Sequence, residues 1–324
     1  MNPSEVLFEG KVPKTLPVCD HYCGTESRMK KALSLQQEMG PCFDITFDCE
    51  DGAPIGLEEQ HAHLVSELIN SSTNAFGRVG VRVHDPQSQH FTQDIDILIK
   101  NSGHRLAYLT IPKVESATQV SHLIEQINSK ALQYGITTQI PIHILIETHG
   151  SLADAFDIAS LAQVECLSFG LMDFVSAHYG AIPASAMSVD QFKHPLVARA
   201  MLEVSAASHR FAKIPSHNVC TEINDVARIR DDCIQAKDLF GYTRKWSIHP
   251  NQIPIIVDAF SPQVHHVDEA IQILLTAQKA DWGPIQFNGK LHDRASYRFY
   301  WMVLQRAKNS GKNFPQMNSL DWFD

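Results

Sequence analysis

The sequence lacks several features that would assign it to a common class of protein. It has no apolar run that approaches the roughly 20 residues needed to cross a bilayer. Its first residues hold no apolar signal core. Basic residues are not in excess, since the net charge is -9 and the isoelectric point is near 6.0. We therefore expect a cytoplasmic protein with neither a membrane nor a nucleic acid as its main partner.

Recognisable cysteine, histidine and nucleotide motifs are also missing. The seven cysteines form no Cys-x-x-Cys pair and their number is odd, so buried free thiols are expected rather than disulfides or a metal site. The pairs His61/His63 and His265/His266 lack the spacing of a zinc site and are expected on the surface. Neither a Gly-x-Gly-x-x-Gly fingerprint nor a P-loop occurs, which disfavours an open nucleotide-binding sheet.

The most informative stretch runs from Pro141 to Asp173. Two short apolar runs, each ending in a carboxylate at Glu147 or Asp173, flank a segment with apolar residues at helical spacing. This pattern predicts strand, helix and strand, with the two acids side by side at the carboxyl edge of a parallel sheet. Two hard oxygen ligands in that position suit Mg²⁺. The alternative is that both acids are only polar strand ends or helix caps.

Strand-like and helix-like segments alternate about eight times, which predicts a (β/α)₈ TIM barrel over residues 1–253. After residue 253 the pattern changes, and we expect a C-terminal helical appendage over residues 254–324. Residues 1–16 should be irregular, and residues 174–193 should form a long active-site loop. The expected strands cover residues 17–22, 43–52, 78–84, 106–113, 141–147, 165–173, 211–215 and 245–250. The expected helices cover residues 25–39, 58–70, 94–100, 117–134, 151–163, 195–208, 224–240, 264–280 and 293–308.

Polar residues at the carboxyl ends of barrel strands face the active site. The residues expected there are Asp48, Glu50, Asp51, Arg82, Lys113, Glu115, Glu147, Asp173 and His249. A surplus of acids with one strand-borne arginine suits a metal site that binds an anionic substrate, because arginine can hold a carboxylate in a bidentate fork. The alternative for Arg82 is a structural salt bridge with Asp48 or Glu50.

Together these residues resemble the citrate lyase β-subunit and malyl-coenzyme A lyase family of carbon–carbon lyases, within the HpcH/HpaI aldolase superfamily. Seven short motifs occur in the family's order. They are Asp48-Cys-Glu50-Asp51, Val81-Arg82-Val83, Pro112-Lys-Val-Glu115, Ile146-Glu147-Thr148, Phe169-Gly-Leu-Met-Asp173, Ile248-His-Pro-Asn-Gln252 and Gly289-Lys290-Leu-His-Asp293.

The resemblance implies a Mg²⁺ ion held by Glu147 and Asp173, and an Arg82 that binds a small 2-oxo or 2-hydroxy acid. It also implies a closed oligomer, most simply a homotrimer, in which Asp293 reaches a neighbouring subunit's site as the acid/base group. Metal and arginine would stabilise charge on oxygen as a carbon–carbon bond breaks or forms, and a carboxylate would move the proton. On this basis the catalytic candidates are Arg82, Asp293, Glu50 and Asp51. The substrate-binding candidates are Arg82, Lys113, Glu115, Gly170, Leu171 and Met172.

Two regions depart from the family pattern. The first strand, within residues 16–24, has no arginine, and residues 58–63 read Glu-Glu-Gln-His-Ala-His where the family carries a lysine and an Ala-Arg pair. Both regions normally help to hold the thioester partner's phosphates, so weak or absent coenzyme A binding is expected and the use of coenzyme A or an acyl carrier stays open. Two other functions also remain open, a thioester hydrolase of a malyl-type substrate and a non-catalytic binding barrel.

Overall fold

The computed structural model describes residues 2–323, which form two compact units. One unit is continuous and covers residues 17–260. The other joins residues 2–16 to residues 261–323, so both ends of the chain belong to it.

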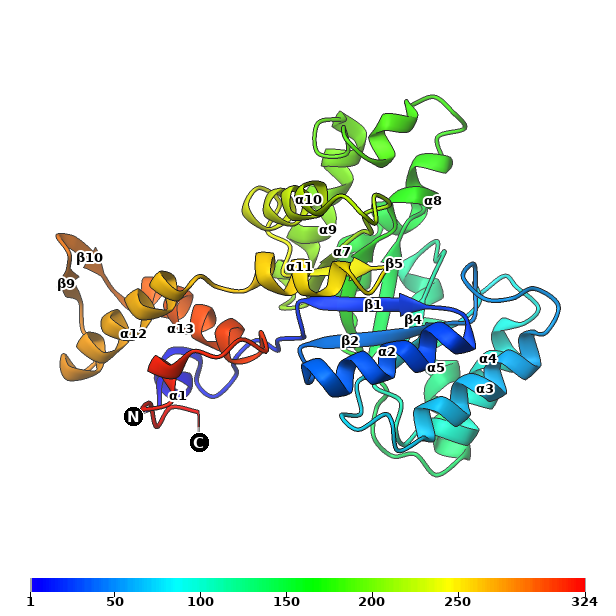
Figure 1. Cartoon of the computed structure of the whole chain (residues 1–324), viewed down its shortest axis with the longest axis horizontal. Helices are drawn as coiled ribbons and strands as arrows, with labels where there is room; N and C mark the ends of the chain where they lie inside the picture. Colours follow the sequence, from blue (N-terminus) through cyan, green and yellow to red (C-terminus); the bar gives the residue numbers. More distant parts are fainter. Residues whose placement is uncertain (1, 324) are drawn as a thin grey trace. The chain divides into compact units, whose positions relative to one another are not determined.

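The continuous unit is built on a closed barrel of eight parallel strands in the order β1 to β8 (Figure 1). The strands are β1 (Cys19–Cys23), β2 (Phe43–Asp48), β3 (Val79–Arg82), β4 (Leu109–Ile111), β5 (Ile142–Ile146), β6 (Val164–Phe169), β7 (Ile214–His217) and β8 (Arg244–Ser247). The barrel closes where β1 pairs with β8, with Cys19 opposite Lys245. This arrangement confirms the predicted (β/α)₈ fold.

Helices with one apolar face cover the outside of the barrel. They are α2 (Glu26–Met39), α3 (Glu58–Asn70), α4 (Phe91–Ser102), α5 (Ala117–Gln133), α6 (His149–Ala153), α7 (Ala155–Ser160), α8 (Leu171–Ser176), α9 (Pro195–Arg210), α10 (Val226–Asp238) and α11 (Gln252–Phe260), with a short 3₁₀ helix, η1, at Ala184–Met187. In α5, for example, the buried residues Val120, Leu123 and Ile127 recur at helical spacing, and the Ser116 side chain caps the first turn. No helix within residues 2–323 is long and apolar enough to cross a membrane.

Several elements of the barrel unit differ from the sequence-based prediction. The sixth strand ends at Phe169, so Asp173, expected at its end, lies in α8, and the expected loop over residues 174–193 contains the end of α8 and the helix η1. The helix expected over residues 151–163 is two short helices that meet at Asp154. The seventh strand begins at Ile214 instead of Phe211, because α9 continues to Arg210 and Ala212 then takes a left-handed conformation with a φ of 53°. The segment after residue 253, expected in the appendage, continues α11, which belongs to the barrel unit.

The second unit has a hydrophobic core of its own. Its elements are α1 (Pro3–Phe8), α12 (Val264–Lys279), the antiparallel hairpin of β9 (Ile285–Phe287) and β10 (Lys290–His292), α13 (Arg294–Lys308) and the 3₁₀ helix η2 (Pro315–Met317). Trp282, Tyr297, Trp301 and Trp322 are buried in this core together with Leu7 of α1. The first sixteen residues, expected as an irregular part of the barrel domain, therefore contribute a helix to the appendage.

Charged residues fill the end of the barrel where the strands begin. The guanidinium of Arg244, at the start of β8, is fully buried and forms ion pairs with Asp20 at 2.9 Å and Asp44 at 2.5 Å. Tyr108 donates a hydrogen bond to Asp20 from the neighbouring side of the interior. Because this end is closed by side chains, the open end at the strand carboxyl termini is the place for a functional site.

Candidate active site

Arg82 is the last residue of β3 and lies 8% exposed at the carboxyl end of the barrel. Its Nε and Nη2 donate to the two oxygens of Asp48, both at 2.8 Å, and its Nη1 lies 2.6 Å from Glu50 Oε2. The salt-bridge alternative predicted for Arg82 is therefore realised, with both acids. A guanidinium has five N–H donors, so these three contacts leave two N–H groups for a ligand.

Two aromatic residues support this guanidinium. Its central carbon lies 4.6 Å from the centre of the Tyr22 ring, a cation–π contact. Trp246 of β8 in turn stacks on the Tyr22 ring, with the ring centres 4.5 Å apart. Burial lowers the pKa of Arg82 to about 10, and the charges of Glu147 and Asp173 oppose that change, so the side chain stays charged at neutral pH.

The turn after β2 is built around the carboxylate of Asp48. This carboxylate accepts the backbone N–H groups of Glu50 at 3.0 Å and Gly52 at 2.7 Å. A Cβ at Gly52 would lie 2.3 Å from Asp48 Oδ2, so only glycine fits this close approach. This turn places Glu50 and Asp51 next to Lys113, which follows β4.

Lys113 connects the acids of β2 to those of β5 and β6. Its Nζ lies 2.6 Å from Glu50 and 3.1 Å from Asp51, and 4.0 Å from Asp173. Its backbone N–H donates to Glu147 Oε1 at 2.7 Å. Lys113 itself has a left-handed φ of 50°, which turns the chain after β4 so that both its backbone and its side chain face the acids.

The two carboxylates predicted to bind metal follow adjacent strands, Glu147 directly after β5 and Asp173 four residues after the end of β6. Glu147 is 3% exposed; burial first, and then the charge of Asp173, raises the pKa of its carboxyl to about 8. A Cβ at Gly170 would lie 2.2 Å from Glu147 Oε2, so the glycine leaves room for this carboxyl. Asp173 follows in the first turn of α8, with its side chain 42% exposed.

The charges at this end of the barrel favour a divalent cation. Five carboxylates, on Asp48, Glu50, Asp51, Glu147 and Asp173, face the two cations Arg82 and Lys113. Within residues 2–323 no group of three His, Cys, Asp or Glu side chains is arranged as a metal site. Mg²⁺ needs no such cage, because it keeps several waters and is commonly bound by one or two carboxylates. The residues present therefore fit Mg²⁺.

Most of the predicted site residues come together around one pocket. It is lined by Tyr22, Arg82, Leu145, Glu147, Phe169, Gly170, Leu171, Met172, Asp173, Asn218, Val219, Trp246 and Ile248. Glu50, Asp51 and Lys113 join it through the ion pairs of Arg82 and Asp173. Glu115 does not line the pocket; it is exposed and lies against Gly150. Asp293 lies in the other unit.

Several residues of this pocket were not among the sequence-based candidates, and three of them carry polar or aromatic side chains important to the site. Tyr22 and Trp246 point into the barrel from β1 and β8, and the alternation of side chains along a strand could have indicated them. Asn218 follows β7, whose position was predicted about three residues too early, and no motif marks it.

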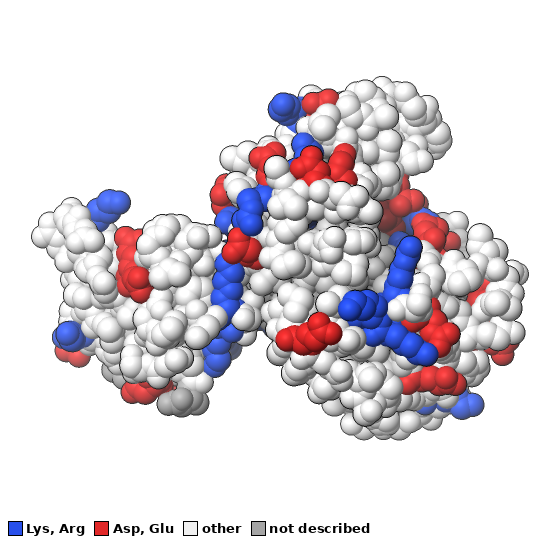
Figure 2. Space-filling model, in the orientation of Figure 1, with Lys and Arg blue, Asp and Glu red and all other residues white. Residues whose placement is uncertain are grey.

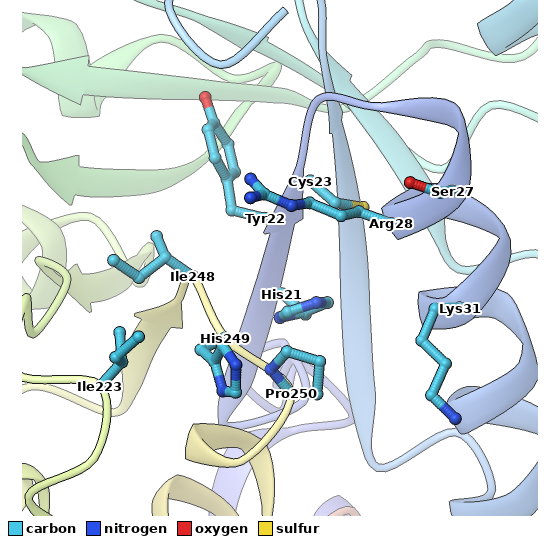
Figure 3. Close-up of a pocket in the computed structure, with 10 residues that line it drawn as sticks. All are labelled: His21, Tyr22, Cys23, Ser27, Arg28, Lys31, Ile223, Ile248, His249 and Pro250. Atoms are coloured by element: carbon cyan, nitrogen blue, oxygen red, sulfur yellow. The ribbon is translucent and has the colours of Figure 1, made fainter.

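A second pocket adjoins the first and shares Tyr22 and Ile248 with it (Figure 3). Arg28 and Lys31 enter it from α2, and the predicted strand-end residue His249 lines it from the opposite side. In Figure 3 the guanidinium of Arg28 extends toward Tyr22, and Lys31 follows one turn along α2. Basic side chains gather over this helix on the molecular surface (Figure 2).

One histidine that was expected on the surface is buried and contacts the backbone of the candidate site. His61 of α3 is buried, and its Nε2 lies 2.8 Å from the backbone oxygen of Asp48. The prediction was wrong for His61 because the first turn of α3 folds under the acidic turn. His63, His265 and His266 are exposed as expected. All seven cysteines are buried and free, which confirms that part of the prediction.

A family model described as HpcH/HpaI aldolase/citrate lyase matches residues 36–250. The chain belongs to this family. A citrate lyase from Burkholderia xenovorans LB400 is similar over 98% of both chains, with 50% identity and a TM-score of 0.87. Among curated proteins, L-malyl-CoA/beta-methylmalyl-CoA lyase of Rhodobacter capsulatus is 23% identical, covering 82% of this chain and 87% of the relative. Malyl-CoA/beta-methylmalyl-CoA/citramalyl-CoA lyase of Chloroflexus aurantiacus is 25% identical, covering 83% and 81%.

These comparisons confirm the predicted family and its reaction class, the carbon–carbon lyases. Protein CitE of Mycobacterium tuberculosis, solved with magnesium, acetoacetate and coenzyme A, has the same fold, with a TM-score of 0.69 and 18% identity over 91% of this chain and 99% of that one. Magnesium in that structure agrees with the cofactor expected from the sequence.

Proposed function

We propose that this family member is a Mg²⁺-dependent carbon–carbon lyase that cleaves or forms a small 2-hydroxy or 2-oxo acid as its coenzyme A thioester. The observation that carries the proposal is a single pocket that holds Arg82, with two N–H groups left for a ligand, beside the carboxylates of Glu147 and Asp173. The names of the curated malyl-CoA lyases, and the magnesium and oxaloacetate in a solved citrate lyase β-subunit, support it.

Glu147 and Asp173 would hold the metal, and Arg82 would hold the substrate's acid group. When bound, Mg²⁺ supplies positive charge close to the oxygen on which negative charge develops. Arg82 is positioned beforehand by Asp48, Glu50 and Tyr22, so little reorganisation is needed when a carboxylate binds its two remaining N–H groups.

In the cleavage direction a carboxylate takes the proton of the substrate's hydroxyl, whose carbon becomes a carbonyl. The carbon–carbon bond breaks, and the electron pair passes to the second fragment as an enolate, which then takes up one proton. A carboxylate must return this proton. We assign that role to Asp293 of a neighbouring subunit, because Asp293 lies exposed on a unit that has its own core. The assembly would be a homotrimer in which each subunit completes its neighbour's site.

The thioester's phosphates would lie in the second pocket, against Arg28 and Lys31. This pocket shares Tyr22 and Ile248 with the acid-binding pocket, so one extended substrate can reach both. The proposal replaces the sequence-based expectation of weak coenzyme A binding, which was drawn from the first strand and residues 58–63; Arg28 and Lys31 were the residues expected to replace those contacts if coenzyme A does bind. We place the protein in the cytoplasm, where seven buried free thiols stay reduced.

Mass spectrometry of the products tests the reaction. The protein is incubated with Mg²⁺ and L-malyl-CoA or citramalyl-CoA. We expect an oxo acid and acetyl-CoA, and no product with Asp173→Ala. A thioester hydrolase would release the free hydroxy acid and coenzyme A instead. A non-catalytic barrel would bind the thioester and leave it intact, so each of these two results contradicts the proposal.

A further inference from the structure

Asn218 combines three features that no assigned function explains. It lies one residue beyond β7, lines the candidate substrate pocket and is only 3% exposed. Its Nδ2 donates to Gln191 Oε1 at 3.0 Å and to the backbone oxygen of Val219 at 2.9 Å. Its Oδ1 has no hydrogen-bond partner among the described residues. A buried acceptor without a partner is costly, so this oxygen needs a donor.

A chain of hydrogen bonds determines which end of the Asn218 amide is the oxygen. It starts at Asp232 of α10, where Arg228 lies 2.9 Å from one carboxylate oxygen and keeps this side chain an acceptor. The other oxygen accepts from Gln191 Nε2 at 3.1 Å. Gln191 must therefore turn its oxygen toward Asn218, and Asn218 must donate its NH₂ group in return. Only the oxygen of Asn218 is left over.

The backbone at this position is also held. Lys245 of β8 is fully buried, and its Nζ donates to the backbone oxygen of Asn218 at 2.6 Å. The same Nζ lies 3.0 Å from His217 Nδ1. Asn218 is thus fixed through its backbone by Lys245 and through its side chain by Gln191. The Asn218 amide cannot exchange the positions of its oxygen and its NH₂ group without breaking a buried hydrogen bond.

We propose that Asn218 Oδ1 accepts a hydrogen bond from a hydroxyl of the substrate, and that Gln191 and Asp232 are positioning residues that maintain this polarity. The inference rests on the proposed function, because it takes this pocket to be the acid-binding site. It makes Asn218 a specificity-determining residue: the site selects an acid that carries a hydroxyl donor over an acid of the same skeleton without one.

Calorimetric titration with L-malate and succinate in the presence of Mg²⁺ tests the inference, because the two acids differ by one hydroxyl. We expect the wild-type protein to bind malate more tightly. Asn218→Leu should reduce the malate-to-succinate preference about tenfold, the loss expected for one hydrogen bond of about 1.4 kcal/mol. Asp232→Asn should also reduce it, because an amide at position 232 allows Gln191 and Asn218 to flip.

Gln235→Leu is the matched control, since Gln235 donates to Asp231 on the exposed face of the same helix. It should leave the preference unchanged. An unchanged preference in both Asn218→Leu and Asp232→Asn overturns the inference, while Mg²⁺-dependent thioester cleavage by wild-type protein would leave the proposed function standing. If Asn218→Leu does not fold, Asp232→Asn decides alone. A wild type that binds neither acid, or binds both equally, also overturns it.

Discussion

The guanidinium of Arg82 is held on three sides before any ligand binds. Asp48 accepts hydrogen bonds from two of its N–H groups, Glu50 forms an ion pair with its Nη1, and the Tyr22 ring lies against its face. Such a group combines high charge with a fixed direction, which a flexible lysine cannot reproduce. From the sequence alone, a salt bridge and a ligand-binding role for Arg82 were alternatives. In this geometry they are compatible, because they use different N–H groups.

We expect Arg82→Lys to weaken binding of oxaloacetate about 10- to 100-fold, because an ammonium cannot replace a planar fork that contacts Asp48 and the ligand together. Isothermal titration with Mg²⁺ present measures the effect. Arg78→Lys is the control, since Arg78 pairs with Asp44 outside the pocket. Unchanged affinity in Arg82→Lys would show that Arg82 serves the structure alone.

Glu147→Ala and Asp173→Ala should each abolish measurable Mg²⁺ binding and leave the barrel folded. Glu147 lines the pocket and is not part of the hydrophobic core, and Asp173 is partly exposed, so neither change disturbs the core. Calorimetric Mg²⁺ titration is the measurement, with thermal unfolding to verify the fold. Glu115→Ala, an exposed acid away from the pocket lining, should bind Mg²⁺ like wild type. Wild-type affinity in both test variants would refute the assignment.

The site residues that sequence predicts and those it misses differ in the range of their interactions. Glu147 and Asp173 were predictable because each follows an apolar strand, and the parallel sheet brings strand ends together, although Asp173 lies in the first turn of α8 and not at the end of β6 as predicted. The role of Asn218 depends on Gln191 and Asp232, which come from a loop and a helix on different sides of it in the chain. No local periodicity encodes such contacts, so only the three-dimensional structure reveals them.

At the scale of elements, the carboxyl end of β3 is tied to α4 by a histidine–carboxylate pair. Both the backbone N–H and the Nδ1 of His84 contact Asp94 Oδ2, at 2.9 and 2.7 Å. Burial lowers the pKa of His84, but the hydrogen bond and charge of Asp94, with smaller contributions from Glu50 and Glu58, outweigh it and raise the pKa above its ordinary value.

This shift predicts how stability depends on pH. Because the folded pKa of His84 is raised, its contribution to the free energy of unfolding is complete below the ordinary pKa of about 6.5 and is lost as pH rises through the folded value. Urea unfolding at pH 6 and pH 9 should therefore show wild type losing more stability than His84→Asn. His63→Asn, at an exposed position, should behave like wild type. Equal losses in wild type and His84→Asn would contradict the prediction.

Helix α2 supplies the basic residues that the first strand lacks. Equilibrium dialysis should show that the protein binds acetyl-CoA, and that the double variant Arg28→Ala/Lys31→Ala binds it at least about tenfold more weakly, the loss expected for two charge-assisted contacts to phosphate. Lys30→Ala is the control, because Lys30 pairs with Glu26 and does not line the pocket. Undetectable binding by wild type would instead support the expectation drawn from the first strand.

Elements with strong periodicity were predictable, and their ends were less so. Helices α2, α5 and α12 were predicted to within a few residues, because each carries one apolar stripe. Helix α1 was missed, since six residues are too short for a periodic pattern and its burial depends on α13 far along the chain.

At the scale of the whole molecule, the assignment of Asp293 requires more than one subunit. In the structure Asp293 caps α13, where its Oδ1 accepts the backbone N–H groups of Ala295 and Ser296. The cap fixes the side chain at the start of a helix, a rigid position for an acid/base group.

Mixing Asp293→Asn protein with Glu147→Ala protein tests the shared site. Each variant should be inactive alone, and mixed oligomers should regain part of the activity, because some sites then combine an intact barrel with an intact Asp293. Subunit exchange is verified by mass spectrometry, and Glu147→Ala mixed with Asp173→Ala is the control that should not recover, since both changes fall in the same barrel. Exchange without recovery would contradict the model.

The union of both chain ends in one unit has a consequence for biosynthesis. Leu7 packs with Trp301, and the side chain of Asn2 donates to the backbone oxygen of Trp322 at 3.0 Å. During synthesis α1 is made long before α13 and can pack against it only after α13 has been made, whereas the barrel can close while translation continues. The smaller unit therefore folds through contacts between segments at opposite ends of the described chain, such as the bond between Asn2 and Trp322, which are 320 residues apart.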